Sequence, residues 1–465
     1  MYRFFISLLS ALLAVAGLFG QPKAADHGKW LLPDVPSFDA GVYSSALYNT
    51  GTGLDQELAP EDAPDAAVDP HYSYMQLVRN ATLTDLLSYC AKLERLGYRQ
   101  TFCNQIENNA YFGYEKGEKR IYVWRSGSTN EVRVADDCCN TASLDAFGYE
   151  NDAAGKTQPG VYQFSYPYKD ALHPDPEVYA ANGMLYAVVL SDRRVIVIDG
   201  GHALQATDRN LAEFWRFLHE ATGKKADAKI KIAMWFGTHM HRDHNAFFLR
   251  FLRRYHEKVD VERYFFNFQA DAVVPSIQAV CRLRRQAATL YPEAKYVKPR
   301  PGYRFRLQDA VCEVLYTHED HVCASDASWR MDNANDASTV LKLTLGGKSF
   351  LFLGDAGLIV QETLLRNFTA ATLHADALQA AHHLYNNLTA LYPVVSPTWV
   401  FCPQSGLRAR TQPLAAFGTL SALVPEKNLL FADGGLCYGL LPDGAGGLTL
   451  KEIPVDCDAD IPAAA

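Results

Sequence analysis

The chain of 465 residues is too long for one ordinary domain and long enough for a catalytic domain with a smaller companion. Hydrophobic residues make up 48% and charged residues 21%, an ordinary globular composition that excludes disorder as the state of most of the chain. The formal net charge of -8 argues against a surface built for unaided electrostatic capture of nucleic acid, although a local basic groove is compatible with it.

The first 20 residues predict an export signal. Arg3 precedes an apolar run from Phe4 to Gly20, and Ala14-Val15-Ala16 fits the small-x-small pattern that signal peptidase accepts. The run is short for a membrane span, which needs about 20 apolar residues. We therefore expect a cleaved signal peptide over residues 1–20, with an uncleaved signal anchor as the alternative. The protein is then secreted or extracytoplasmic, and membrane-anchored if the segment is retained.

The chain has ten cysteines and no CxxC pattern. Export would place them where disulfides can form. The adjacent residues Cys138 and Cys139 are poorly placed to pair with each other. We expect one or two disulfides, small buried side chains for most of the other cysteines, and no cysteine metal site.

The N-terminal third divides into a linker, a small domain and a connection. Residues 21–70 predict a linker, because Pro, Gly, Asp and Ala recur there without an apolar period. Residues 71–137 predict a small α+β accessory domain, with a helix that is capped near Thr82, ends at Gly97 and precedes three strands at 111–114, 120–124 and 131–134. This unit has no cluster of titratable residues, which favours an accessory or adaptor role. Residues 138–177 form the connection.

Residues 178–460 predict a larger domain in which strands and helices alternate, which is typical of an α/β fold. We expect strands at 184–190, 195–198, 230–236, 311–316, 339–345 and 350–353, and helices near 210–220 and 274–290.

A cluster of metal-binding residue types directly follows the strand that ends at Phe236. His239 and His241 are two residues apart, so an extended backbone directs both imidazoles to one side. Asp243 and His244 follow at a turn and can face a second ion. A lone histidine is usually a satisfied core residue, but three histidines and one aspartate within six positions point to a metal site. Imidazole and carboxylate ligands suit zinc, manganese or iron.

The segment from Thr238 to His244 matches the HxHxDH signature of the metallo-β-lactamase superfamily, and the chain resembles that superfamily over roughly residues 180–445. The strand that ends at Asp199 looks like the first motif, the strand that ends at Asp355 looks like the fourth, and residues 376–383 look like the fifth. The resemblance implies an α/β (α+β) chain: an αββα metallo-β-lactamase sandwich preceded by the small α+β domain.

The third motif departs from the usual pattern, in which the β-lactamases place a histidine. Residues 333–341 here read Asn-Ala-Asn-Asp-Ala-Ser-Thr-Val-Leu. This segment is similar to the Asn-rich segment in the hydrolase domain of ComEC-type DNA-uptake proteins, which also share the Gly-Asp and His-His pairs. We expect Asp336 to replace the missing histidine and rank Asn335 below it. His318 and His321 are rival candidates, but we expect them to be exposed loop residues.

The resemblance also implies roles for the site residues. One ion would be held by His239, His241 and the third-motif residue. The other would be held by Asp243, His244 and His382, with His383 as the alternative to His382. Asp355 would bridge the two ions, Asp199 would orient the metal loop, and Asp243 could double as proton acceptor.

We expect a hydrolase in which two divalent ions, zinc first and manganese or iron as alternatives, convert a shared water to hydroxide near neutral pH. Its substrate is expected to be a small molecule or a phosphodiester. The alternatives are hydrolysis of another ester, amide or lactone bond, and a non-catalytic exported metal-binding protein. DNA uptake itself is not implied, because no membrane-spanning stretch follows the N-terminal segment.

Overall fold

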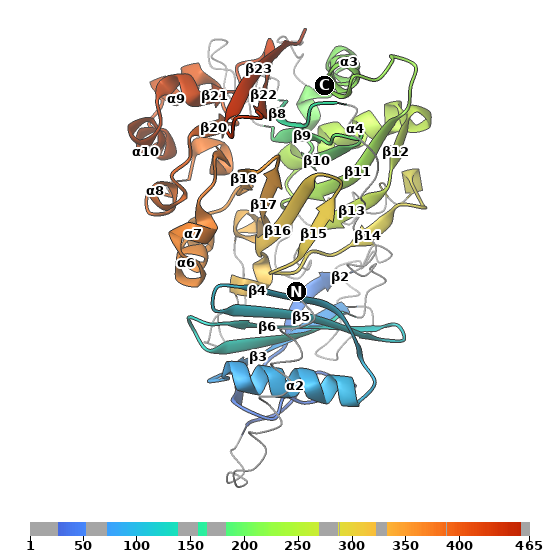
Figure 1. Ribbon diagram of the computed structural model, residues 1–465, viewed down its shortest axis with the longest axis vertical. Coiled ribbons are helices and arrows are strands. Elements are labelled where there is room, and N and C mark those ends of the chain that lie inside the picture. Colours follow the sequence, from blue (N-terminus) through green and yellow to red (C-terminus); the bar gives the residue numbers. More distant parts are fainter. Residues whose placement is uncertain are drawn as a thin grey trace.

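The computed structural model describes residues 27–52, 72–137, 157–164, 183–268, 287, 289–321, 333–386 and 388–456 (Figure 1). The predicted export segment 1–20 and most of the predicted helix at 274–290 lie outside these ranges. Within them, no helix is both long enough and apolar enough to cross a membrane. Cys90, Cys103, Cys312 and Cys402 are free thiols, and the Cys437 thiol donates to the Gln163 carbonyl at 2.9 Å. The disulfide prediction therefore concerns only the other five cysteines.

The accessory domain is a seven-stranded antiparallel sheet with one helix against it (Figure 1). Its strands run in the order β1-β3-β7-β6-β5-β4, and β2 also pairs with β3. Their bounds are β1 (Val42–Tyr43), β2 (Tyr48–Thr52), β3 (Tyr72–Arg79), β4 (Arg99–Ile106), β5 (Asn109–Lys116), β6 (Lys119–Ser126) and β7 (Glu131–Asp137). The three predicted strands are thus confirmed as β5, β6 and β7, and β3 and β4 precede them in the chain.

Helix α2 (Leu83–Arg95) begins at Thr82 with a capping box, in which Thr82 and Asp85 satisfy each other's backbone N–H groups. Its buried face, which includes Leu86 and Leu93, packs into one core with Val123 and Val132 of the sheet. The predicted helix is confirmed, and its amphipathic spacing is the reason it forms against the sheet.

The linker prediction is wrong for residues 27–52. Leu32, Val35 and Phe38 are buried in the core of the accessory domain, and β1 and β2 pair with β3. These apolar residues are spaced irregularly because the segment lies on the domain as extended and turning chain. No helix or strand period could therefore reveal it.

The larger domain contains two facing sheets. The first runs in the order β14-β13-β11-β10-β9-β8-β22-β23, with β12 also beside β11. Its strands are β8 (Gly160–Gln163), β9 (Leu185–Val189), β10 (Val195–Asp199), β11 (Ile230–Gly237), β12 (Val259–Val261), β13 (Arg263–Phe266), β14 (Lys295–Val297), β22 (Leu436–Pro442) and β23 (Leu448–Pro454).

The second sheet follows the chain order β15-β16-β17-β18-β19-β20-β21. Its strands are β15 (Arg304–Leu307), β16 (Ala310–Tyr316), β17 (Val340–Leu345), β18 (Lys348–Phe352), β19 (Ala377–Gln379), β20 (Trp399–Cys402) and β21 (Leu429–Phe431).

Alternating side chains on the first sheet separate two cores. Ile196 and Ile198 of β10 join the core shared with the second sheet, whereas Val195 and Val197 join the core under the helices α3 (Asp208–Thr222) and α4 (Ala246–Arg254). The period of two places alternate residues on opposite faces of a strand. Since the apolar run of β10 is continuous, both faces of this sheet are covered.

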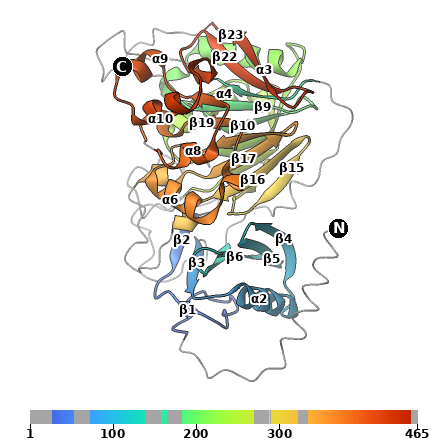
Figure 2. The same cartoon turned by 60° about the vertical axis from the view of Figure 1, so that its left-hand side comes forward.

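Helices cover the outer face of each sheet, and the larger domain is therefore an αββα sandwich (Figure 2). The first sheet carries α3 (Asp208–Thr222) and α4 (Ala246–Arg254). The second carries α6 (Leu358–Asn367), α7 (Ala370–Leu373), α8 (Leu391–Val395), α9 (Gly406–Thr411) and α10 (Ala415–Leu423). Short 3-10 helices complete the domain: η3 (Ala203–Gln205), η4 (Arg242–His244), η5 (His256–Lys258), η8 (His318–His321), η9 (Ala334–Ala337), η10 (Ala381–Leu384) and η11 (Glu426–Asn428).

The predicted connection over 138–177 contains one strand of the sandwich. Strand β8 lies between β9 and β22, and Val161 and Tyr162 are both fully buried. The expectation of a plain connection is wrong at 160–163. Four residues are too few to show an alternating pattern, and their partners come from β22, which is distant in the chain.

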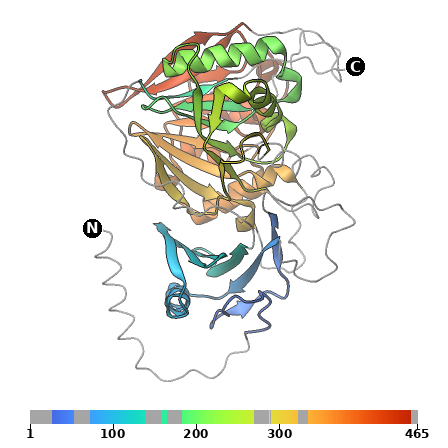
Figure 3. The same ribbon diagram turned by 90° about the vertical axis from the view of Figure 1, so that its right-hand side faces the viewer.

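The accessory sheet lies against one end of the sandwich (Figures 1 and 3). Trp124 Nε1 donates to Asp320 Oδ1 at 3.0 Å, and the Tyr48 hydroxyl lies 2.8 Å from His318 Nδ1. Asn104 Nδ2 donates to the Gly302 carbonyl at 2.8 Å. Gly302 has a φ of +77°, and a Cβ there would lie 2.1 Å from the Tyr111 ring, so the contact requires glycine.

The same interface buries ionic groups and His318. The fully buried Arg300 donates to Glu319 Oε1 at 2.7 Å and lies over the Tyr122 ring. His318, which we expected to be exposed, is completely buried, and His321 is half-buried. The expectation is wrong because the accessory sheet covers the end of β16, where these residues lie.

Asp320 makes the stability of this interface dependent on pH. Burial raises the pKa of Asp320 from 3.8 to about 6. Because the folded-state pKa is the higher one, the contribution of Asp320 is fully present below pH 4 and is lost as the pH rises through 6. Asp320→Asn mimics the protonated form. Relative to this variant, the wild type should lose about 2–3 kcal/mol of unfolding free energy between pH 4 and pH 7.

Chemical denaturation with a chelator present, which keeps metal binding out of the comparison, measures this difference. Asp34→Asn removes a carboxylate that is 89% exposed and serves as the control. A difference between wild type and Asp320→Asn that stays constant with pH would contradict this account.

Candidate metal centre

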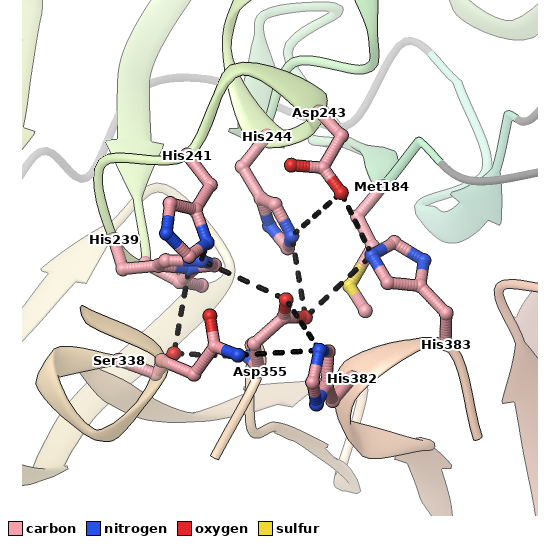
Figure 4. A network of polar contacts seen from close by, with 12 residues as sticks. Met184, His239, His241, Asp243, His244, Ser338, Asp355, His382 and His383 are labelled. Atoms are coloured by element: carbon pink, nitrogen blue, oxygen red, sulfur yellow. Dashed lines mark hydrogen bonds and ion pairs between the residues drawn. The ribbon is translucent and has the colours of Figure 1, made fainter. Parts of the chain in front are cut away.

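The loops that follow four strands meet at one end of the sandwich. Strands β10 and β11 are parallel, as are β18 and β19, so their carboxyl ends lie at the same edges of their sheets. Asp199 ends β10, the His239–His244 loop follows β11, Asp355 follows β18, and the His382-His383 pair follows β19. The fold thereby gathers residues that are far apart in the chain into one polar cluster (Figure 4).

Two groups of ligand atoms share one carboxylate. Asp243, His244, Asp355 and His383 form the first group, in which one ligand atom of each residue lies within 4.8 Å of the others. His239, His241 and Asp355 form the second group by the same measure. We call these the four-residue group and the three-residue group.

The two oxygens of Asp355 face different groups (Figure 4). Asp355 Oδ1 lies 3.2 Å from His244 Nε2 and 3.8 Å from His383 Nε2, whereas Oδ2 lies 3.7 Å from His239 Nε2. His239 Nε2 is in turn 3.0 Å from His241 Nδ1. A carboxylate in this position can bridge two cations.

The buried atoms of the cluster fit cations. His244 Nε2, His383 Nε2 and Asp355 Oδ1 are buried and lie at ion-pair distance from one another or from Asp243, but none has a partner in hydrogen-bond geometry among the described residues. Buried polar atoms are normally satisfied, and their exceptions call for an explanation such as an ion. Imidazole nitrogens and carboxylate oxygens together form a donor set for zinc, manganese or iron.

Residues behind the ligands fix the orientation of the imidazole rings. Asp199 Oδ2 accepts from His244 Nδ1 at 2.8 Å, and the carbonyl of Pro403 accepts from His383 Nδ1 at 3.2 Å. With Nδ1 occupied in this way, the Nε2 lone pair of each ring is directed into the cluster. Asp199 Oδ1 also accepts from the backbone N–H of Thr238 at 2.8 Å, which holds the start of the metal loop.

Electrostatics prepare the cluster for positive charge. Burial lowers the pKa of His239 and of His241, which favours neutral rings with a lone pair on one nitrogen. Burial alone would lower the pKa of His244, but the carboxylates of Asp355, Asp199 and Asp243 raise it well above 6.5. In the absence of a cation, protons on His244 balance these carboxylates. Bound cations would displace such protons.

The vicinal histidines adopt a backbone that separates their side chains. His382 and His383 have φ values of 48° and 51°, and Leu384 has a φ of 69°. Left-handed backbone costs about 1–2 kcal/mol for each such residue and is concentrated at functional sites. Asn386 Nδ2 braces the turn by donating to the carbonyls of Asp355 and Ala356. The turn places His383 in the four-residue group and leaves His382 at its edge, 27% exposed and 3.9 Å from Asp355 Oδ2.

The structure brings together most, but not all, of the sequence-predicted site residues. His239, His241, Asp243, His244 and Asp355 converge, and Asp199 lies directly behind them. His383, the alternative to His382, takes the position in the four-residue group.

Asp336, expected as the third-motif ligand, belongs to neither group. Its Oδ1 lies instead against Gly357 at the start of α6, so close that a Cβ on this glycine would clash with it. His318 is also outside the cluster, because its Nε2 lies 3.0 Å from Asn267 Oδ1.

Several supporting residues were not anticipated from the sequence. Ser338 Oγ accepts from the backbone N–H of Asp355 at 2.9 Å. Gln379 Oε1 accepts from the backbone N–H groups of Leu353 and Gly354 at 2.7 Å each. Hydroxyl and amide side chains that bind backbone have no distinctive spacing, so only the folded geometry shows their roles.

No sequence family and no curated protein matches the chain. Solved structures similar to it include the metallo-β-lactamase fold protein YhfI from Bacillus subtilis, with 10% identity, a TM-score of 0.34, and coverage of 57% of this chain and 94% of that one. The metallo-β-lactamase GOB-18 from Elizabethkingia meningoseptica has 12% identity, a TM-score of 0.27, and coverage of 59% and 94%. The diiron β-hydroxylase CmlA from Streptomyces venezuelae has 13% identity, a TM-score of 0.29, and coverage of 54% and 46%. These identities are too low to transfer an activity.

Asp199→Asn should weaken cation binding about 10- to 100-fold, since the amide cannot accept from both His244 and the metal loop. Chelator competition on the purified protein measures this loss. Asp376→Asn is a matched control, because Asp376 also accepts from a backbone N–H and a hydroxyl, both of Ser349, but belongs to neither ligand group. Equal affinities in Asp199→Asn and wild type would refute an orienting role for Asp199.

Proposed function

We propose that the protein is a metal-dependent hydrolase that uses two divalent ions, with zinc as the first expectation and manganese or iron as alternatives. The observation that carries this proposal is the buried carboxylate of Asp355, which is shared by the two ligand groups. His239, His241 and Asp355 would hold one ion. Asp243, His244, His383 and Asp355 would hold the other.

Two neighbouring divalent ions supply acidification of a water molecule and polarisation of the scissile bond. The protein's own part is to hold the ligands, exclude solvent and move protons. The side chains of Asp355 and His244 are almost completely buried, whereas those of Asp243 and His382 are 24% and 27% exposed. Asp243 is therefore the group that can exchange a proton with a substrate at the open side of the cluster.

We further propose a phosphodiester as the substrate class. The support is the similarity of residues 333–341 and of the His382-His383 pair to the ComEC-type hydrolase domain. Two adjacent cations also suit this chemistry, because they can stabilise the attacking and the leaving oxygen of a displacement at phosphorus. Hydrolysis of another ester, amide or lactone bond remains the second candidate, since one fold supports many reactions. Export through residues 1–20 is part of the proposal.

The test is hydrolysis of a substrate panel by the purified protein with added zinc or manganese. We expect cleavage of a phosphodiester such as bis-p-nitrophenyl phosphate or single-stranded DNA, and at least about a 10²-fold loss in His241→Ala. His256→Ala, which removes an exposed histidine outside both ligand groups, should retain full activity.

The panel also contains lactones, β-lactams and carboxylic esters. Cleavage of one of these, with phosphodiesters untouched, would replace the proposed substrate class while leaving the two-ion hydrolase intact. Fewer than one tightly held metal ion per chain, together with no cleavage of any substrate, would instead identify a non-catalytic binding protein.

A further inference from the structure

The two ligand groups differ in their number of residues and in their charge. What we infer from this difference rests on the two-ion function proposed above. The four-residue group contains two carboxylates and two imidazoles, whereas the three-residue group contains His239, His241 and the shared Asp355. A cation in the three-residue group would have fewer protein ligands and less negative charge around it. Residues next to this group would therefore complete the set of protein ligands around the cation.

The turn η9 lies beside the three-residue group. Ser338, which follows this turn, lies with its Oγ 3.4 Å from His239 Nδ1. Asn335, within this turn, extends toward the cluster, because its Nδ2 lies 3.2 Å from His382 Nε2. Asp336 is one position further along and contacts Gly357 instead.

The side-chain amide of Asn335 has a hydrogen-bond partner at its nitrogen but none at its oxygen among the described residues. Its Nδ2 lies 3.2 Å from His382 Nε2, and this ring nitrogen is 3.9 Å from Asp355 Oδ2. Its Oδ1 is buried and has no hydrogen-bond partner among the residues described. Asn335 as a whole is only 7% exposed. The carbonyl oxygen of an amide can bind a cation, and a cation would satisfy this buried oxygen, which has no donor.

We infer that Asn335 Oδ1 is the fourth protein ligand of the cation held by His239, His241 and Asp355. His382 is a positioning residue, because its Nε2 accepts from Asn335 Nδ2 and so holds the amide with its oxygen free. The turn itself is fixed by the Asn333 side chain, which accepts from the backbone N–H of Asn335 at 3.0 Å.

A neutral amide in place of a charged ligand makes the two cation positions unequal in affinity. The position with Asn335 has one carboxylate, whereas the position with Asp243 has two. Affinity for divalent cations rises with the negative charge of the ligands. The Asn335 position should therefore fill second when the purified chain is titrated with Mn²⁺.

Calorimetric titration of the full-length, metal-stripped protein with Mn²⁺ tests this inference. We expect two binding steps in the wild type. Asn335→Ala should weaken the second step at least tenfold and leave the first unchanged, and Asn335→Asp should strengthen the second step. Asp336→Ala is the matched control and should keep both steps.

His382 is tested by rescue. His382→Ala should weaken the second step, and His382→Gln should restore it, because the glutamine carbonyl can again accept from Asn335 Nδ2. Absorption of bound Co²⁺ gives a second readout, in which Asn335→Ala should change the bands of the second ion only.

Two unchanged steps in Asn335→Ala would overturn the inference while leaving the two-ion function in place. If Asn335→Ala does not fold, Asn335→Asp decides alone, and an unchanged second step then overturns the inference. A wild-type chain that binds fewer than two ions contradicts the proposed function itself.

Discussion

The carboxylate of Asp355 is the group on which the metal centre depends. It lies where the carboxyl ends of β11 and β18 meet, 2% exposed, with each oxygen facing a different set of histidines. Burial opposes the charge of Asp355, yet His244 and His383 hold the pKa of this carboxyl well below its usual range. So much charge is stable in a buried site only when it is balanced and its geometry is fixed. The Ser338 and Gln379 hydrogen bonds to the turn that carries Asp355 supply that fixation.

The accessory domain packs directly against the sandwich. Its sheet joins the sandwich through buried polar contacts, including those of Trp124 with Asp320 and of Tyr48 with His318. The accessory sheet therefore holds the end of β16 and the turn η8 in place, which gives the domain a structural role in the sandwich.

Features with a strong local signal could be predicted from the sequence. The alternation and apolar runs of β9, β10, β11, β16, β17 and β18 identified strands, and the spacing from His239 to His244 identified the metal loop. Features set by distant contacts could not be predicted. Strand β8 and residues 27–52 depend on partners far along the chain, and the left-handed turn at His382 and His383 decides which histidine joins the four-residue group. Whether Asp336 or Asn335 faces the metal centre depends on the direction in which each residue points from the 3-10 turn. A comparison of motifs does not detect this direction.

Crystals soaked in Mn²⁺ and measured at a wavelength where manganese scatters anomalously would show whether Asp355 is shared by two ions. We predict two anomalous peaks, one on each side of Asp355, with one oxygen of this carboxylate bound to each ion. One peak should also contact His239 and His241, and the other should contact Asp243, His244 and His383. A single peak, or two peaks of which neither contacts Asp355, would contradict the two-ion centre.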